Sequence, residues 1–258
     1  MDSSFLREVD LHIHTWRSAC ARSEMRLAAI VETAAERGLK FVGVTDHVDA
    51  YVGPNVLWET EKELTQLRTS VRVFLGCEAD ILAVGKHVVS DEMKTRLDYI
   101  MVSANHFHDP AVSQPIGNSP VEVAKHFLEM FSYACSLGFV DVIAHPLVVF
   151  SNTFDTACLD FISDEDIAEA ALLARRNGIA MEISPRGFDQ EQRAFRIRFL
   201  SICKQVGLKF AIGTDAHSLD RIGSTWRLEP LLAEVGITDE DIWLPSSRGC
   251  SACRAVIE

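Results

Sequence analysis

The sequence predicts an α/β fold built around parallel strands. Short apolar runs alternate with longer amphipathic segments along most of the 258 residues, and this alternation favours strands joined by covering helices. The amphipathic segments end near glycines, and histidines or carboxylates follow the apolar runs. A chain of this length suits one large domain, and α/β barrels commonly reach this size. We therefore expect residues 1–258 to form a single domain.

Seven apolar runs have the length and composition of buried strands. In chain order they are Val9–Ile13, Phe41–Val44, Val71–Leu75, Tyr99–Val102, Val140–Ile143, Ile179–Ile183 and Phe210–Ile212.

Four amphipathic segments between these runs are predicted to be helices. In Met25–Arg37, apolar residues recur at helical spacing from Leu27 to Ala34, and Gly38 supplies a stop. The other three are Val121–Ser136, Asp164–Arg176 and Gln190–Gln205, each followed closely by a glycine. Ser163 and the acidic residues after it form a capping signature at the start of one of them.

Each predicted strand runs into polar residues that can bind a metal or a substrate. In parallel α/β folds such residues collect at the carboxyl ends of the strands. In chain order they are His12 and His14, Asp46 and His47, Glu78 and Asp80, Asn105 and His106, His145, Glu182 and Arg186, and Asp215 and His217. This distribution is hard to reconcile with a purely structural role.

The segment DLHIHT at residues 10–15 is the strongest local signal for a metal site. Residues two apart on a strand face the same side, so His12 and His14 can bind one centre. Asp10 falls on the same face and can orient an imidazole. Two hydrogen-bonded histidines on a strand are the alternative interpretation.

Carboxylates complete the candidate site. Glu78 closes an apolar strand, and a buried carboxylate calls for a cation beside it. Glu182 is either a ligand or an ion-pair or hydrogen-bond partner. Asp215 and His217 repeat the two-residue spacing after the last predicted strand. Imidazole with carboxylate suits zinc, manganese or iron.

Three other histidines do not fall at the predicted strand ends. His126 is expected to be exposed on a helix, and His87 to lie in a surface segment. His108 is expected in a loop, although its position two residues after His106 would also let it face the same pocket.

Composition excludes several functional classes. The formal net charge is -12 and no cluster of Lys and Arg appears, so nucleic-acid binding is not expected. No apolar run approaches the roughly 18 residues of a transmembrane helix, and the first dozen residues do not resemble a signal peptide. Seven scattered cysteines then suit reduced thiols in a cytoplasmic protein.

The ordered motifs resemble those of the PHP (polymerase and histidinol phosphatase) domain family, specifically its stand-alone phosphoesterases that are similar to histidinol phosphatase. The matching segments are DLHIHT at 10–15, TDH at 45–47, GCEAD at 76–80, SANHF at 103–107, AHP at 144–146 and GTDAH at 213–217. The resemblance runs from Asp10 to about Gly223. It implies a distorted (β/α)7 barrel, similar to a TIM barrel, with two or three divalent metal ions at the strand ends.

The resemblance also implies roles for individual residues. His12, His14, Glu78 and Asp215 would hold one ion. Glu78 would bridge to a second ion, also held by His106 and His145. His47 and His217 would belong to a third.

The sequence departs from the family pattern at Cys20, which stands where many members carry another histidine. A thiolate is a good zinc ligand, so Cys20 is a candidate ligand of the third ion. A buried, non-ligating thiol is the alternative.

The resemblance implies hydrolysis of a small phosphomonoester by water activated on the metal ions. Glu78, Asp215 and His217 would be the catalytic residues, the last two also managing proton transfers. Arg17, Arg186 and Arg221 are candidates for binding phosphate oxygens, and surface salt bridges are their alternative roles.

Two further functions remain open at this point. One is a related hydrolase of a cyclic phosphate, nucleotide or amide bond, and the other is a metal-binding accessory domain without turnover. The pair Cys250 and Cys253 has CxxC spacing, but one such pair is weak evidence for zinc or redox chemistry.

Overall fold

The computed structural model describes residues 5–150, 153–186 and 191–246. Parallel pairing joins β1 (Val9–Ile13), β2 (Phe41–Val44) and β4 (Arg72–Leu75). A second parallel series runs in the order β10 (Phe210–Ile212), β9 (Ala180–Ile183), β8 (Val142–Ile143), β7 (Met101–Ser103), β5 (Glu78–Ala83) and β3 (His47–Val48). The short strand β6 (Lys86–His87) pairs antiparallel with β5.

Two breaks divide strands that would otherwise be continuous. β2 passes into β3 across residues 45–46, and β4 passes into β5 across residues 76–77. Backbone hydrogen bonds continue through both breaks, since Glu78 N donates to Asp46 O at 3.1 Å. The second and third strand positions of the barrel are therefore each filled by two short strands.

The first and last strand positions meet just beyond the end of β10. Ile13 pairs with Ala216 in parallel. His14 N donates to Ala216 O at 3.0 Å, and Ala216 N donates to His12 O at 3.1 Å. These bonds close a distorted (β/α)7 barrel with positions β1, β2–β3, β4–β5, β7, β8, β9 and β10, which confirms the expected fold.

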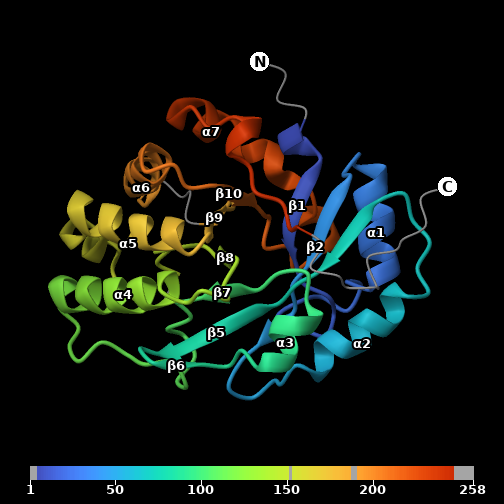
Figure 1. The fold of residues 1–258 in the computed structure, drawn as a ribbon, viewed down its shortest axis with the longest axis horizontal. Coiled ribbons are helices and arrows are strands. Elements are labelled where there is room, and N and C mark those ends of the chain that lie inside the picture. The colour runs from blue at the N-terminus through green and yellow to red at the C-terminus, as the bar shows by residue number, and fades with distance from the viewer. Residues whose placement is uncertain (1–4, 151–152, 187–190, 247–258) are drawn as a thin grey trace.

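Helices surround the barrel on its outer side (Figure 1). Their bounds are α1 (Leu27–Glu36), α2 (Asn55–Leu64), α3 (Asp91–Arg96), α4 (Pro120–Cys135), α5 (Asp164–Arg176), α6 (Arg193–Gln205) and α7 (Glu229–Val235). In Figure 1, α4, α5 and α6 lie side by side next to β7–β10, whereas α1 and α2 lie near β1 and β2. Ser119 and Ser163 form capping boxes at the starts of α4 and α5.

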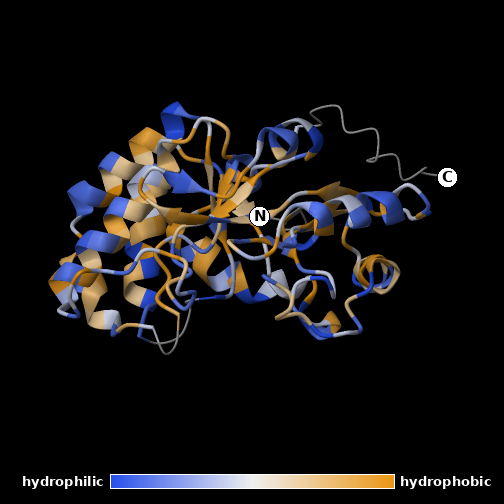
Figure 2. Ribbon diagram, turned by 90° about the horizontal axis from the view of Figure 1, so that it is seen from below, coloured by the Kyte–Doolittle hydropathy of each residue, from blue (hydrophilic) through white to orange (hydrophobic). Residues whose placement is uncertain are grey.

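Apolar side chains fill the space between the strands and these helices. All five residues of β1 and all four of β9 are buried. Figure 2 shows hydrophobic residues concentrated along the strands and polar residues on outward-facing parts of the helices. Burial of this apolar surface is the main force that fixes the strand ends in place. In the described part of the chain, no helix combines the length and apolarity needed to cross a membrane.

The structure adds elements that apolar patterns do not predict. The two-residue strands β3 and β6 are too short for a hydrophobic pattern. Glu78 was expected to close a strand but begins β5, because buried apolar residues follow it at Ala79, Ile81 and Leu82. The expected helix Gln190–Gln205 starts at Arg193 within the described residues.

Candidate metal centre

Glu78, the first residue of β5, lies at the centre of the polar side chains at the carboxyl end of the barrel. Its side chain is only 1% exposed. Oε2 lies 3.2 Å from His12 Nε2 and 3.4 Å from His14 Nε2. Oε1 lies 2.6 Å from His145 Nε2 and 3.4 Å from His106 Nε2. Oε2 also lies 3.2 Å from His47 Nδ1. The two oxygens of one carboxylate therefore face two different sets of histidines.

Four buried side chains, from His12, His14, Glu78 and Asp215, bring one ligand atom each into a compact group. His12 Nε2 lies 3.0 Å from His14 Nε2. Asp215 Oδ1 lies 3.2 Å from His14 Nε2 and 3.7 Å from His12 Nε2. A tetrahedral ion with bonds of about 2.0–2.1 Å separates its ligand atoms by about 3.3 Å. The observed separations lie around that value, so these residues fit a four-coordinate divalent ion.

Hydrogen bonds to the opposite ring nitrogens orient three of the imidazoles. The Nδ1 atoms of His12, His106 and His145 lie 2.7 Å from Glu182 Oε1, 2.8 Å from Asp80 Oδ1 and 2.9 Å from Asn105 Oδ1, respectively. Each oxygen accepts the Nδ1 proton, so Nε2 is directed toward Glu78 and presents its lone pair to a cation when the ring is neutral. Metal-ligating histidines are held in the same way.

A serine that sequence reasoning overlooked orients His14. Ser18 Oγ lies 3.3 Å from His14 Nδ1 and donates to Asp46 Oδ1 at 2.7 Å. Because the hydroxyl proton goes to Asp46, the oxygen accepts the Nδ1 proton of His14. The signal in the sequence was a serine four residues after His14, in the turn that follows β1.

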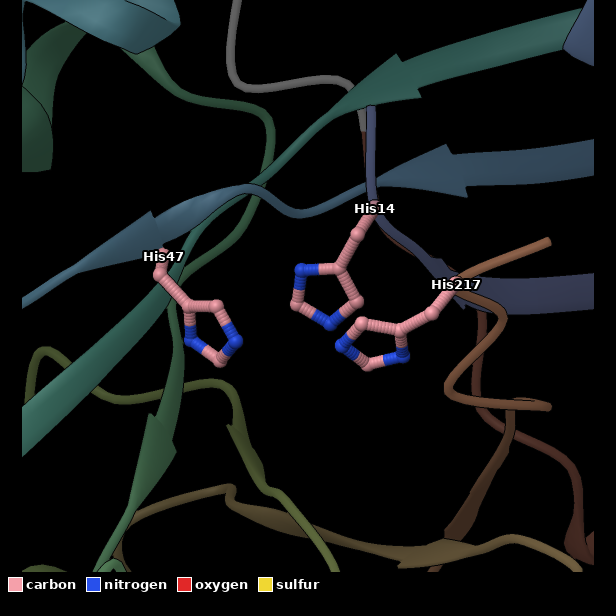
Figure 3. A group of neighbouring side chains, drawn as sticks. All are labelled: His14, His47 and His217. Carbon is pink, nitrogen blue, oxygen red and sulfur yellow. The ribbon is translucent and has the colours of Figure 1, made fainter. Parts of the chain in front are cut away.

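A third group joins His14, His47 and His217, whose ligand atoms approach one another closely. Figure 3 shows the three imidazoles turned toward one another from separate segments of the chain. The ring centroid of His14 lies 4.4 Å from that of His47 and 4.3 Å from that of His217. His217 Nδ1 donates to the carbonyl oxygen of Asp215 at 2.9 Å, so its Nε2 carries the lone pair.

Cys20 lies near this third group but outside it. The residue is exposed and lines the same pocket as His47, and it belongs to none of the close ligand groups found in the described residues. Partial desolvation of the thiol, together with the carboxylates of Glu78 and Asp215, raises its pKa to about 11. The thiol is therefore protonated at neutral pH unless a cation offsets those carboxylates.

Asp10 does not orient an imidazole, contrary to the expectation from the sequence. Its carboxylate accepts hydrogen bonds from Thr214 N at 2.9 Å, Thr214 Oγ1 at 2.6 Å and Gly223 N at 2.8 Å. These bonds tie β1 to the loop that carries Asp215, whose φ is 51°. Glu182 holds the His12 imidazole instead, and it also accepts a hydrogen bond from His145 N.

The three candidate arginines occupy different surroundings. Arg17 is 11% exposed, pairs with Glu63 and lines a pocket of about 180 Å³ beside His47 and His106. Arg186 pairs with Asp215, and its Nη2 lies 3.4 Å from His217 Nδ1. Arg221 is exposed on the short 3-10 helix Leu219–Arg221, and it is not among the residues lining that pocket.

The charges around Glu78 divide the histidines into two kinds. Burial lowers the pKa of His12 and His106, but neighbouring carboxylates outweigh it and raise the pKa of His106 to about 10 and that of His12 well above its usual value. Burial drives the pKa of His47 well below normal, and burial with His14 lowers that of His217 to about 4. The surroundings of His12 and His106 therefore favour a proton or a cation on the ring, whereas His47 and His217 stay neutral at neutral pH.

The remaining histidines stand outside the ligand groups. His126 is half-buried rather than exposed, because its Nε2 donates to Ser113 O at 2.7 Å. His87 is half-buried against Phe139. His108 is exposed in a loop but also lines the pocket next to His106. Cys250 and Cys253 lie outside the described residues.

Fold and site together define a metal-binding α/β-barrel protein. The family model described as the PHP domain matches residues 10–186, which include all the candidate ligand residues except Asp215 and His217. The chain belongs to the PHP domain family.

Known proteins extend the similarity over nearly the whole chain. A protein of Photobacterium profundum named "probable phosphatase" is 28% identical over 246 residues, covering 93% of this chain and 90% of its own. One of the same name from Caldicellulosiruptor bescii is 27% identical over 232 residues, covering 88% of this chain and 87% of its own.

A solved structure supports the fold independently. Histidinol phosphate phosphatase of Lactococcus lactis, solved with zinc, L-histidinol and phosphate, superposes with a TM-score of 0.64. The alignment covers 89% of this chain and 94% of that chain at 16% sequence identity. At this identity the likeness supports the barrel architecture.

Proposed function

We propose that this protein is a metal-dependent phosphoesterase that hydrolyses a small phosphomonoester with water. The observation that carries the proposal is the position of Glu78, whose two oxygens face two separate sets of histidines. A carboxylate so placed can hold two cations close together, which is the arrangement used in two-metal hydrolysis of phosphate esters.

The first and third of the proposed ligand sets correspond to close groups in the structure. The second rests on the distances from Glu78 Oε1 to His106 and His145, and His47 also groups closely with Glu78 and His106. His12, His14, Glu78 and Asp215 would hold one divalent ion, and Glu78 with His106 and His145 a second. His47 and His217, with Cys20 or His14, would hold a third. The donor set of imidazole and carboxylate suits zinc, manganese or iron.

Divalent ions in such a site make hydroxide available near neutral pH and neutralise charge on phosphoryl oxygens. The chain supplies the remaining functions. Arg17 lines the pocket, and Arg186 contacts Asp215 and lies near His217. Their guanidinium groups can bind phosphoryl oxygens. Where no ion occupies the third set, neutral His217 presents an Nε2 lone pair that can accept a proton. Asp215, held by Arg186, keeps Oδ1 directed toward His12 and His14.

Two observations support a small phosphorylated substrate. The pocket beside His47 and His106 is about 180 Å³, which suits a metabolite rather than a polymer. The curated relatives are named phosphatases, and the structural neighbour was solved with histidinol and phosphate. A phosphomonoester resembling histidinol phosphate is therefore the first substrate to assay.

The experiment is a screen of phosphorylated metabolites with protein loaded with zinc, manganese or iron. Phosphate release that a chelator abolishes and metal restores is the expected result. Stoichiometric metal binding without release from any phosphate ester, cyclic or linear, would instead indicate an accessory domain without turnover.

A further inference from the structure

Arg17 has an environment unlike that of an ordinary surface arginine. It follows His14 by three residues, in the turn that leads from β1 into the pocket. Its side chain is 11% exposed, and its Nη2 donates to Glu63 Oε1 at 2.5 Å. The guanidinium also lies 5.1 Å from the centroid of the Trp16 ring. A carboxylate and an aromatic ring therefore hold the Arg17 guanidinium at the pocket wall.

The other terminal nitrogen of Arg17 is not used by the protein. Nη1 is buried and has no hydrogen-bond partner among the described residues. A buried donor without a partner is costly, and a guanidinium presents its donors in a fixed planar fork. Because Glu63 engages Nη2, it also sets the direction of Nη1.

We propose that Glu63 is a positioning residue that holds Arg17 so that Nη1 can donate to a phosphoryl oxygen of the substrate. This inference rests on the proposed function. Glu63 lies on α2 and does not line the pocket, so its effect passes through Arg17. Exposed ion pairs contribute little to stability, but this pair joins a half-exposed carboxylate to a nearly buried cation whose residue lines the candidate site.

The test is calorimetric titration of inorganic phosphate into metal-loaded protein. Arg17→Ala should weaken phosphate binding roughly 10- to 100-fold, as expected for loss of a charge-assisted hydrogen bond. Glu63→Ala should weaken it roughly 3- to 10-fold, and the double variant should be no weaker than Arg17→Ala alone. The KM for a phosphomonoester should rise by similar factors, with a smaller change in kcat.

Glu61→Ala is the matched control, since it removes another ion pair of α2, with Arg96, away from the pocket lining. It should bind phosphate like the wild type. Metal content and thermal stability of each variant identify any general loss of folding. Normal phosphate binding by folded Glu63→Ala, or additive losses in the double variant, would overturn the role of Glu63. Failure of the metal-loaded wild type to bind phosphate or hydrolyse any phosphomonoester would overturn the proposed function itself.

Discussion

The Nε2 atoms of His12 and His14 face each other across 3.0 Å at the end of β1. Glu182 and Ser18 accept the Nδ1 protons of these rings, so both Nε2 atoms carry lone pairs when the rings are neutral. Two lone pairs at this distance repel unless a proton or a metal cation lies between them. Side chains alternate between the two faces of β1, so His12 and His14 lie on the same side. The strand geometry therefore places their two Nε2 atoms where a cation can bind both.

Replacing Glu78 tests whether one carboxylate serves two ions. Glu78→Gln keeps the size of the side chain but removes the charge that faces both sets of histidines. We expect metal content and phosphatase activity to fall together, with activity falling on the order of 100-fold or more. Removing a residue that only hydrogen-bonds to a ligand already lowers metal affinity or activity about 10- to 100-fold. Elemental analysis and phosphate release measure the two effects.

Glu36→Gln, on the exposed side of α1, is the control for that experiment. It should keep wild-type metal content and turnover. A Glu78→Gln protein with normal metal stoichiometry and normal turnover would show that Glu78 is not the bridge.

Glu182 should affect metal affinity without being a ligand. It holds His12 through Nδ1 and accepts the backbone N–H of His145, so it orients residues from both sides of Glu78. Glu182→Gln should weaken metal binding roughly 10- to 100-fold while leaving the number of bound ions at saturation unchanged. Competition with a chromogenic chelator gives the affinity. A lower stoichiometry at saturating metal would make Glu182 a ligand instead.

Metal binding should release a proton from His106. In protein stripped of metal, burial opposes protonation of His106, but Glu78 and Asp80 raise its pKa to about 10. His106 is therefore protonated at pH 7.5 and must lose that proton to bind a cation. His217, with a pKa of about 4, is already neutral and releases none. Affinity at the site containing His106 should consequently fall as the pH is lowered from 9 toward 7.

Calorimetric titrations in buffers of different ionisation enthalpy count the protons released. His106→Gln should remove one proton from the count at pH 7.5. A metal-binding enthalpy that does not vary with the buffer would contradict protonation of His106 in the metal-free protein.

The strand ends and their ligands could be predicted because their signals are local. The two-residue spacing of His12 and His14 fixes their common face, and the apolar run before Asp215 marks the end of a strand. All three residues lie at or just beyond the strand ends that the sequence predicts. The helix Asp164–Arg176 is also found with its expected bounds, since Ser163 caps it through hydrogen bonds to its own first turn.

The residues that hydrogen-bond to the candidate ligands could not be predicted, because these contacts form only when the barrel closes. Asp10 bonds to Thr214 across 204 positions of sequence, and Glu182 meets His12 across 170. The residues next to Asp10 and Glu182 in the sequence do not indicate that Glu182 orients an imidazole and that Asp10 bonds to the loop carrying Asp215. The choice between them follows from which strands are neighbours in the barrel.

Cys20 offers the sharpest test of the third ion. The structure brings His14 into a group with His47 and His217. Either the thiol joins these imidazoles as a ligand, or they bind an ion without it. A ligating thiol must lose its proton, and its pKa is raised to about 11 by partial desolvation and by Glu78 and Asp215. Ions held by those carboxylates would offset their charge and lower the pKa.

If Cys20 ligates, Cys20→Ser should remove about one metal equivalent while the ions at Glu78 stay bound, because a hydroxyl is a much poorer zinc ligand than a thiolate. Cys20→His should restore that equivalent and shift the preference from zinc toward manganese or iron, which accept imidazole without thiolate. Elemental analysis of both purified variants measures the change, and Cys158→Ser, at a cysteine outside the ligand groups, is the control. Unchanged zinc content in Cys20→Ser would show that the thiol does not ligate. The three imidazoles would then have to hold the third ion themselves, and His47→Ala would be the variant that loses it.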